Sequence, residues 1–333
     1  MREVWILAET KAGRVAPVSF ELLAWARSLG SPEEISVAAV LPGPAADPEE
    51  LCLHGADLVY HAADPALDGL AAAPVALVFG SLFARRRPEV LLAAATTTGR
   101  TLLPYLAARE GLGLTADCTE LELERETGVL LQTRPAAGGN IMATIKTTRG
   151  LPQAATVRPR SRKPLARDPG RPVRVEMVAL PAGAAAAAAR GPRLVEELPF
   201  AESKGLADAP LVVAGGRGFK KKEGFALLEG LASRLGAEIG ASREAVDRGW
   251  IEYPHQVGLS GRTIAPDFYL AFGISGAIQH LAGMQTAGTI VAVNADPDAP
   301  IFALSDLAVR GDLFDLLPRL AAALEDYRPA ARS

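Results

Sequence analysis

The sequence is poor in cysteine and in aromatic residues, and neither sign of charge dominates it. Its 333 residues include two cysteines and 5% aromatic residues, and the formal net charge is −3. Cys52 and Cys118 lie far apart and form no CxxC pair, so we expect buried free thiols rather than a disulfide framework or a structural metal site. The small net charge gives no electrostatic reason to expect a nucleic-acid partner, which would favour a clustered basic face.

Targeting signals and common catalytic motifs are also missing. No basic leader precedes the apolar segment at Val4, and no apolar run reaches the ~20 residues of a membrane span, so a cytoplasmic protein is expected. The sequence contains no Walker lysine motif, GxSxG elbow or HExxH pair. No nucleophile–base arrangement is evident, which argues against a hydrolase built on the first part of the chain.

The first part of the chain alternates apolar strands with amphipathic helices. This alternation predicts a parallel sheet with helices on both faces, and 333 residues are enough for two such domains. We expect strands at Val4–Ala8, Ile35–Leu41 and Asp57–His61, helices at Ser19–Leu29 and Pro48–His54, and a continuation of the alternation through Val75–Gly80 and Thr101–Glu110.

The pattern changes after about residue 115. Short strand-like segments at Thr119–Glu126, Val129–Arg134 and Ile141–Thr147 predict a small antiparallel extension, with a turn at Gly138-Gly139-Asn140. A loop rich in proline and arginine follows at Arg158–Pro172, and the six alanines of Ala184–Ala189 are interpreted as part of a linker. The domain boundary is placed between about residues 180 and 208, which gives domains 1–200 and 208–333.

The second domain is again predicted to be an open, doubly wound α/β sheet. Ligands of such sheets bind outside the carboxyl ends of the strands. We expect strands at Pro210–Ala214, Glu238–Gly240, Phe268–Gly273 and Thr289–Asn294, and helices at Gly224–Leu235 and Asp312–Leu324.

Two glycine-bearing loops of this domain have both a structural and a functional interpretation. Gly215–Gly218 lacks the full GxGxxG spacing; its Arg217 could bind a phosphate, but a plain turn explains the glycines equally well. Ser242 is adequately explained as a helix cap. Arg243 is not, because a cation in the first turn opposes the helix dipole and calls for an anion such as Glu244 or a ligand.

A third loop, Gly273–Met284, passes from a strand through a tight turn into a helix. Its backbone N–H groups and the helix start suit a diphosphate. His280 could reach a ring, or could be an ordinary core or surface histidine. The polar segment Pro254–Gly261 is either a binding loop or a connector. The residues alone therefore predict a dinucleotide-type site without acid–base machinery.

These segments resemble, in order and spacing, the FAD domain of electron transfer flavoprotein α subunits. The resemblance continues through Asp296–Phe302 and Gly311–Phe314, and the segments Thr115–Cys118 and Arg134–Asn140 of the first domain also resemble that family. The positions that the resemblance assigns to FAD are Arg217, Ser242, Arg243, Gln256, Val257, Gly258, Leu259, Ser260, Ser275, Gly276, Ala277, Ile278, Gln279, His280, Asn294, Asp312 and Leu313.

The resemblance also implies individual roles. Arg243 would stand against the isoalloxazine and raise its potential, since its charge favours the reduced ring. The Ser260 hydroxyl would approach flavin N5, and His280 would hydrogen-bond the pyrimidine side. Asn294 and Asp312 would hold the adenosine end, with Leu313 beside it, while Arg217 and Ser242 would lie near the diphosphate.

The implied function is electron transfer by a heterodimer with a β subunit. The expected electron donors are acyl-CoA or other dehydrogenases, as in fatty acid oxidation, and the expected acceptor is a quinone reductase or a similar protein. Two departures concern the flavin loop: Leu259 stands where glutamine is common, and Ser260 where threonine is common. They leave open an NADH-dependent, electron-bifurcating carrier with a second FAD. A non-redox nucleotide-binding module is the competing class.

Overall fold

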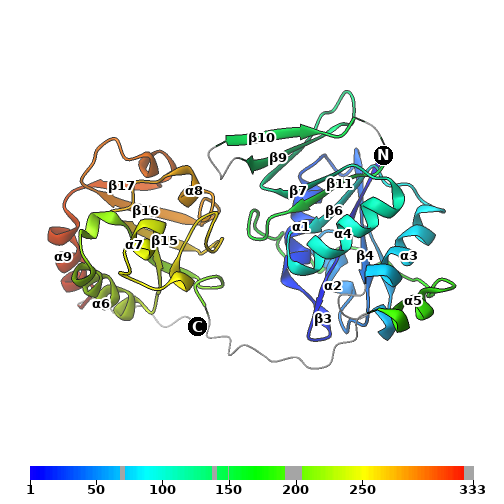
Figure 1. Cartoon of the computed structure of the whole chain (residues 1–333), viewed down its shortest axis with the longest axis horizontal. Coiled ribbons are helices and arrows are strands. Elements are labelled where there is room, and N and C mark those ends of the chain that lie inside the picture. Colours follow the sequence, from blue (N-terminus) through cyan, green and yellow to red (C-terminus); the bar gives the residue numbers. More distant parts are fainter. Residues whose placement is uncertain (68–71, 137–140, 149, 192–204, 326–333) are drawn as a thin grey trace. The chain divides into compact units, whose positions relative to one another are not determined.

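The computed structural model describes residues 1–67, 72–136, 141–148, 150–191 and 205–325 (Figure 1). They belong to two compact units, Met1–Leu198 and Pro199–Ser333. The division falls inside residues 192–204, which lie outside the described residues.

The first unit is built on a parallel sheet with the strand order β12-β5-β4-β1-β6-β11-β7. Val4–Leu7 of the central strand are at most 1% exposed, as expected for a parallel strand covered on both faces. Its elements are β1 (Arg2–Leu7), β2 (Thr10–Lys11), β3 (Arg14–Val15), α1 (Pro17–Arg27), β4 (Ile35–Pro42), α2 (Glu49–Leu53), β5 (Leu58–Ala62), η1 (Pro65–Leu67), α3 (Ala72–Phe83), β6 (Val90–Ala94), α4 (Thr97–Glu110), β7 (Leu114–Cys118), β8 (Glu120–Leu123), β9 (Leu130–Ala136), β10 (Ile141–Lys146), β11 (Gln153–Val157), β12 (Val175–Met177) and α5 (Ala184–Arg190).

Two cores cover the two faces of this sheet. Val4 and Ile6 of β1 face the core formed with α1 and α2, while Trp5 and Leu7 face the core formed with α3 and α4. The side chain of Thr96 caps α4 by accepting a hydrogen bond from Gly99 N–H at 3.0 Å. The central strand β1 is therefore packed on both faces.

Val75–Gly80, to which the sequence assigned no element type, lies within helix α3; a short, wholly apolar run fits a buried helix as well as a strand. Two features of this unit differ from the sequence-based expectation. The strand β6, between α3 and α4, was not predicted. The alanine tract is not a linker: Ala184–Arg190 forms α5, which packs against α3. Alanine's helix propensity and this packing outweigh the flanking glycines.

The antiparallel extension is confirmed. Strands β8, β9 and β10 pair in the order β10-β9-β8, with Thr133 opposite Thr144. The predicted turn at Gly138-Gly139-Asn140 lies outside the described residues.

The second unit is a parallel sheet with the strand order β14-β13-β15-β16-β17. Helices α6 and α9 pack together on one face (Figure 1), and α8 and η6 contribute to the core of the other. Its elements are β13 (Leu211–Gly215), η3 (Arg217–Phe219), η4 (Lys222–Gly224), α6 (Phe225–Leu235), β14 (Glu238–Ala241), α7 (Arg243–Asp247), η5 (Tyr253–His255), β15 (Phe268–Phe272), α8 (Ile278–Leu281), β16 (Thr289–Asn294), η6 (Pro300–Leu304), β17 (Leu307–Arg310) and α9 (Leu313–Glu325). The predicted fold class, two open parallel-sheet domains with a small antiparallel extension, is confirmed.

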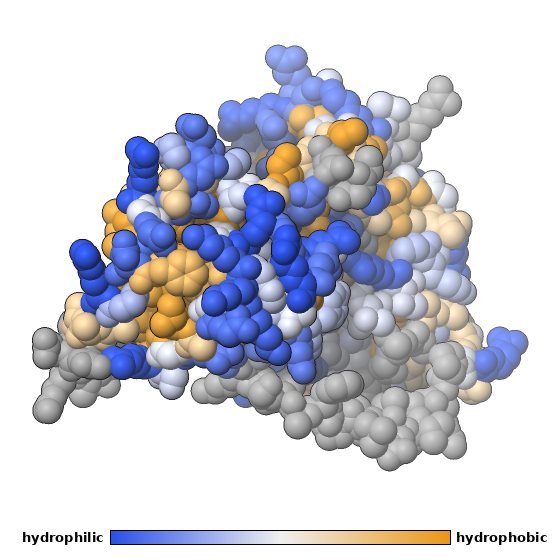
Figure 2. Space-filling model, turned by 60° about the vertical axis from the view of Figure 1, so that its left-hand side comes forward, coloured by the Kyte–Doolittle hydropathy of each residue, from blue (hydrophilic) through white to orange (hydrophobic). Residues whose placement is uncertain are grey.

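The molecular surface mixes hydrophilic residues with small apolar patches in the view of Figure 2. Exposed apolar side chains of the second unit include Tyr253, Phe268, Ile278 and Leu307. None of the described helices is both long enough and apolar enough to span a bilayer.

Candidate cofactor site

The sequence-predicted residues converge on one edge of the second sheet. Because its strands are all parallel, their carboxyl ends meet at a common edge, and the strand order changes direction at β13 and β15, where such folds bind ligands. Arg217 follows β13, and the pair Ser242–Arg243 follows β14. The segment Ser275–His280 follows β15, Asn294 ends β16, and Asp312 follows β17.

The loop with residues 256–260 joins this edge through backbone hydrogen bonds. Val257 N–H donates to Ala241 O at 2.9 Å, which ties the loop to the end of β14. Leu259 N–H donates to Gln279 O at 2.8 Å, which ties it to α8. The segment is therefore fixed beside the other predicted residues.

Glycine is required in this edge by close backbone approach. A Cβ on Gly216 would lie 2.4 Å from Gly273 O, so the glycines after β13 serve packing whether or not a phosphate binds. Gly276 has φ +85°, and a Cβ there would lie 2.4 Å from Ile301 N. Leu313 packs against the same backbone; its Cδ2 lies 2.8 Å from the Cβ position of Gly273.

The two arginines lie at the surface of this edge in weak ion pairs. Arg243 Nε lies 3.3 Å from Asp247 Oδ2, with side chains 71% and 61% exposed. Asp247, rather than Glu244, is thus the protein anion that accompanies Arg243, and the alternative of a ligand anion stays a prediction. Glu244 instead meets Arg248 at 2.8 Å and Arg217 at 3.5 Å. Such exposed pairs are worth little, so both guanidinium groups can exchange them for a bound anion.

Two polar atoms of the site are buried without a hydrogen-bond partner among the described residues: Ser242 Oγ and His280 Nδ1. Ser242 occupies the N-cap position of α7, but its side chain makes no capping bond, so capping does not account for it. Buried polar groups are normally paired, and these two unpaired atoms lie at the edge of the sheet where such folds bind ligands. These two atoms fit a polar cofactor.

His280 is buried and makes one side-chain bond. Its Nε2 lies 2.9 Å from the hydroxyl of Tyr269, on β15. Burial lowers the pKa of His280 to about 4, and the backbone of Val257 opposes this effect in part. The ring therefore stays neutral near pH 7 and is suited to hydrogen bonding rather than to proton transfer. Tyr269 was missed in the sequence, although a tyrosine in a buried strand usually needs a partner for its hydroxyl.

Four other predicted polar residues form hydrogen bonds within the protein. Gln256 Nε2 donates to Ser260 Oγ at 2.9 Å. Asn294 Nδ2 donates to Ile274 O at 2.9 Å, and its Oδ1 accepts from Asp296 N–H, so this side chain braces the loop after β15. Asp312 Oδ1 accepts from Phe314 N–H at 2.8 Å, at the start of α9.

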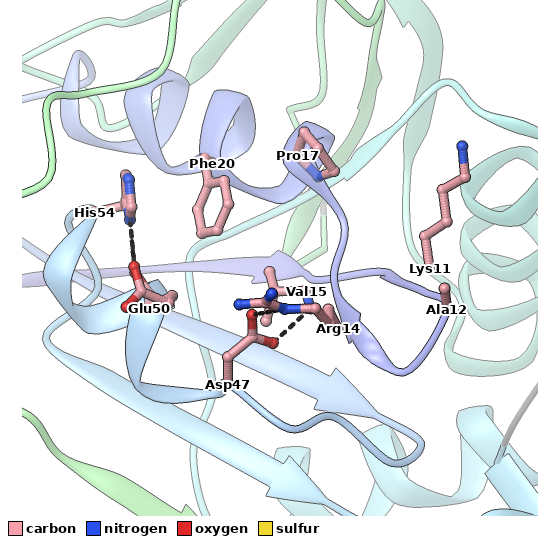
Figure 3. A pocket seen from close by; sticks show the side chains of 9 residues that line it. All are labelled: Lys11, Ala12, Arg14, Val15, Pro17, Phe20, Asp47, Glu50 and His54. Carbon is pink, nitrogen blue, oxygen red and sulfur yellow. Dashed lines mark hydrogen bonds and ion pairs between the residues drawn. The ribbon is translucent and has the colours of Figure 1, made fainter. Parts of the chain in front are cut away.

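A separate open pocket of about 410 Å³ lies in the first unit and contains none of the predicted residues (Figure 3). Asp47 holds Arg14 at 2.9 Å, and His54 stacks on Phe20 and lies 3.7 Å from Glu50. Its polar groups are thus largely engaged with one another. In the described part of the chain, no cluster of histidine, cysteine and acidic residues could hold a metal ion.

Comparison with known proteins gives matches to the domains of one protein family. Residues 4–183 match the model of the electron transfer flavoprotein domain, and residues 205–285 match the model of the electron transfer flavoprotein FAD-binding domain. The chain is 43% identical to an electron transfer flavoprotein subunit alpha from Thermoanaerobacterium thermosaccharolyticum, with 96% of each chain covered.

Two further relatives are similar over nearly the same length. The subunit alpha of Megasphaera elsdenii is 40% identical, with 98% of each chain covered. The protein FixB of Bradyrhizobium diazoefficiens is 41% identical, with 97% of this chain and 88% of the relative covered. The FAD-domain match includes the ends of β13, β14 and β15, where the buried unpaired atoms lie.

Proposed function

This chain belongs to the electron transfer flavoprotein family as an α subunit, and we propose that it works as the FAD-holding half of a heterodimeric electron carrier. FAD is the cofactor of the FAD-binding domain that the second unit matches. When bound, FAD supplies reversible electron transfer, and the residues of this chain hold it, tune its potential and exclude water. The observation that carries the proposal is the pair of buried, unpaired atoms, Ser242 Oγ and His280 Nδ1, at the carboxyl edge of the sheet.

The edge offers complementary groups to each part of the cofactor. Arg217 and Ser242 suit the diphosphate, together with the backbone N–H groups of the turn Ser275–Ala277. Arg243 suits the isoalloxazine, where a fixed positive charge favours the reduced ring. Asp312 suits the adenosine end, with Leu313 beside it, while Asn294 supports the loop after β15 that carries the turn.

Ser260 is oriented to donate a hydrogen bond. Its Oγ accepts from Gln256 Nε2, so its own proton is available to an acceptor such as flavin N5. The backbone carbonyl of Ser260 accepts from the Tyr253 hydroxyl at 2.7 Å, which fixes the loop from the other side. Serine therefore supplies the same donor that threonine would, and Leu259 adds no polar group beside it.

The relatives' names imply a second subunit, and we assign the first unit to pairing with a β subunit. The proposed electron donors are acyl-CoA or other dehydrogenases, and the proposed acceptor is a quinone reductase or a similar protein. The heterodimer would then be reduced by one protein and oxidised by another, without bond chemistry on a substrate by this chain.

Anaerobic reduction of the purified heterodimer tests this function. An acyl-CoA dehydrogenase with its substrate is expected to bleach the flavin absorbance, whereas NADH alone is not. Reduction by NADH together with two FAD per heterodimer would favour the bifurcating alternative, which the Leu259 departure motivates. A folded dimer that retains no flavin would favour the competing interpretation, a non-redox nucleotide-binding module.

A further inference from the structure

Tyr269 is a buried residue outside the predicted FAD-contacting set, yet it contacts His280 directly. Its side chain is 0% exposed and His280 is 5% exposed. The 2.9 Å contact joins the Tyr269 hydroxyl to His280 Nε2. Among the described residues, His280 is the one hydrogen-bond partner of this hydroxyl. The two side chains therefore form a polar pair inside an apolar core that includes Ala271 and Met284, with the backbone of Val257 as a further polar neighbour of His280.

The protonation states of the pair follow from this burial. Burial raises the pKa of Tyr269 and lowers that of His280 to about 4, so the phenol stays protonated and the imidazole stays neutral near pH 7. A neutral imidazole carries one donor nitrogen and one acceptor nitrogen. The hydrogen bond to Tyr269 decides which nitrogen is which.

Two arrangements of the pair are conceivable. If the Tyr269 hydroxyl donates to Nε2, the imidazole proton sits on Nδ1, and every polar atom of the pair except Nδ1 is satisfied. If Nε2–H donates to Tyr269, the phenol proton is left buried without an acceptor, which is costly. The first arrangement makes Nδ1–H the donor, and Nδ1 is the ring atom that forms no hydrogen bond of normal geometry in the structure, although the backbone of Val257 interacts with the ring.

We propose that Tyr269 is a positioning residue that acts on the flavin through His280, by donating to Nε2 and so keeping Nδ1–H as the donor to the pyrimidine side of the ring. This inference rests on the proposed function, because it takes the flavin as the partner of Nδ1. Tyr269 thereby aligns the imidazole without touching the cofactor.

The tautomer can be read by ¹⁵N NMR of the histidine-labelled heterodimer, with FAD bound and after FAD removal. The chain has four histidines, and His280→Gln identifies the resonances of interest. The wild type is expected to show Nδ1 protonated and Nε2 unprotonated. Tyr269→Phe is expected to move the proton toward Nε2 and to raise the Kd for FAD about tenfold, the loss of about one good hydrogen bond.

Tyr60→Phe is the matched control. Its hydroxyl is also buried, in the first unit, and has no partner among the described residues, so this variant is expected to leave the His280 tautomer and FAD binding unchanged. A wild-type His280 protonated at Nε2 would overturn the proposal without any variant. An unchanged Kd in Tyr269→Phe would overturn it as well, even if the tautomer moved.

Failure of the inference and failure of the proposed function are distinguishable. A wild-type heterodimer that binds no FAD would refute both. A wild type that binds FAD and transfers electrons, combined with a Tyr269→Phe variant that behaves identically, would refute the role of Tyr269 alone.

Discussion

Removal of the Ser242 hydroxyl is expected to act with opposite sign on the free protein and on its complex with FAD. Ser242 Oγ is buried at the N-cap position of α7 and makes neither a capping bond nor any other hydrogen bond among the described residues. Without FAD, Ser242→Ala therefore removes an unpaired polar atom, whose burial costs about 1–3 kcal/mol. The free energy of unfolding of the second unit should stay the same or rise by about 1 kcal/mol.

With FAD present, the same substitution removes a bond to the cofactor. A hydrogen bond to the negatively charged diphosphate is worth about 1.5–3 kcal/mol, so the Kd for FAD should rise at least about tenfold. Ordinary N-cap serines behave differently, since their replacement by alanine costs about 1 kcal/mol whether or not a ligand is bound. The sign of the effect without FAD thus separates the two interpretations of Ser242.

Fluorotryptophan NMR during urea titration can follow the second unit by itself. The chain has three tryptophans, Trp5, Trp25 and Trp250, and Trp250 belongs to the second unit, where it packs near Phe225. Ser305→Ala is the matched control, because Ser305 Oγ donates to Ile301 O at 2.8 Å and its loss should cost about 1 kcal/mol. A comparable loss in Ser242→Ala without FAD, with an unchanged Kd for FAD, would refute the reasoning.

Three further predictions use the same reporter or the flavin itself. Gly276→Ala should destabilise the second unit by at least about 1–2 kcal/mol and lower its FAD content, because φ is +85° and the new Cβ meets Ile301 N at 2.4 Å. The control is Gly230→Ala in α6, where a Cβ has nothing within 4 Å; it should stabilise the second unit by about 1 kcal/mol, and a loss of stability would contradict the packing argument. The free energy of unfolding of the FAD-free second unit should fall by up to about 3 kcal/mol as the pH falls from about 6.5 to 4, because His280 takes up a proton in the unfolded state that its burial excludes in the folded state. His280→Gln should remove this pH dependence. Arg243→Gln should cost less than about 0.5 kcal/mol in stability, because its pair with Asp247 is exposed. It should nevertheless lower the two-electron midpoint potential of the flavin by ~30 mV for each tenfold loss of preference for the reduced ring, and an unchanged potential in redox titration would place Arg243 away from the ring.

Local sequence patterns predict the second unit well because its site depends on chain order. Loops that follow parallel strands must meet at one edge, so the order of strands and loops along the chain is enough to group Arg217, Ser242 and the loop Gly273–Met284. Asp312 follows β17, a strand that was not predicted, and was assigned to FAD by the resemblance alone. Contacts between side chains are less predictable. The partner of Arg243 is Asp247 rather than Glu244, and this depends on side-chain rotamers within one turn of α7.

The failures share a physical cause, which is tertiary packing that no local pattern encodes. Val75–Gly80 is apolar throughout and has no period that separates a buried helix from a strand. The alanines of α5 form a helix because they pack on α3. Tyr269 was overlooked because its importance comes from a hydroxyl contact with His280, eleven residues away.

The FAD content of the purified heterodimer tests the central claim most directly. The chain would be co-expressed with its β subunit, and the released cofactor would be identified and counted for the wild type, for Gly276→Ala and for Phe20→Leu, which alters the pocket of the first unit. The account predicts one FAD in the wild type, less in Gly276→Ala and no change in Phe20→Leu. A folded, colourless wild type, or a loss of FAD confined to Phe20→Leu, would contradict it.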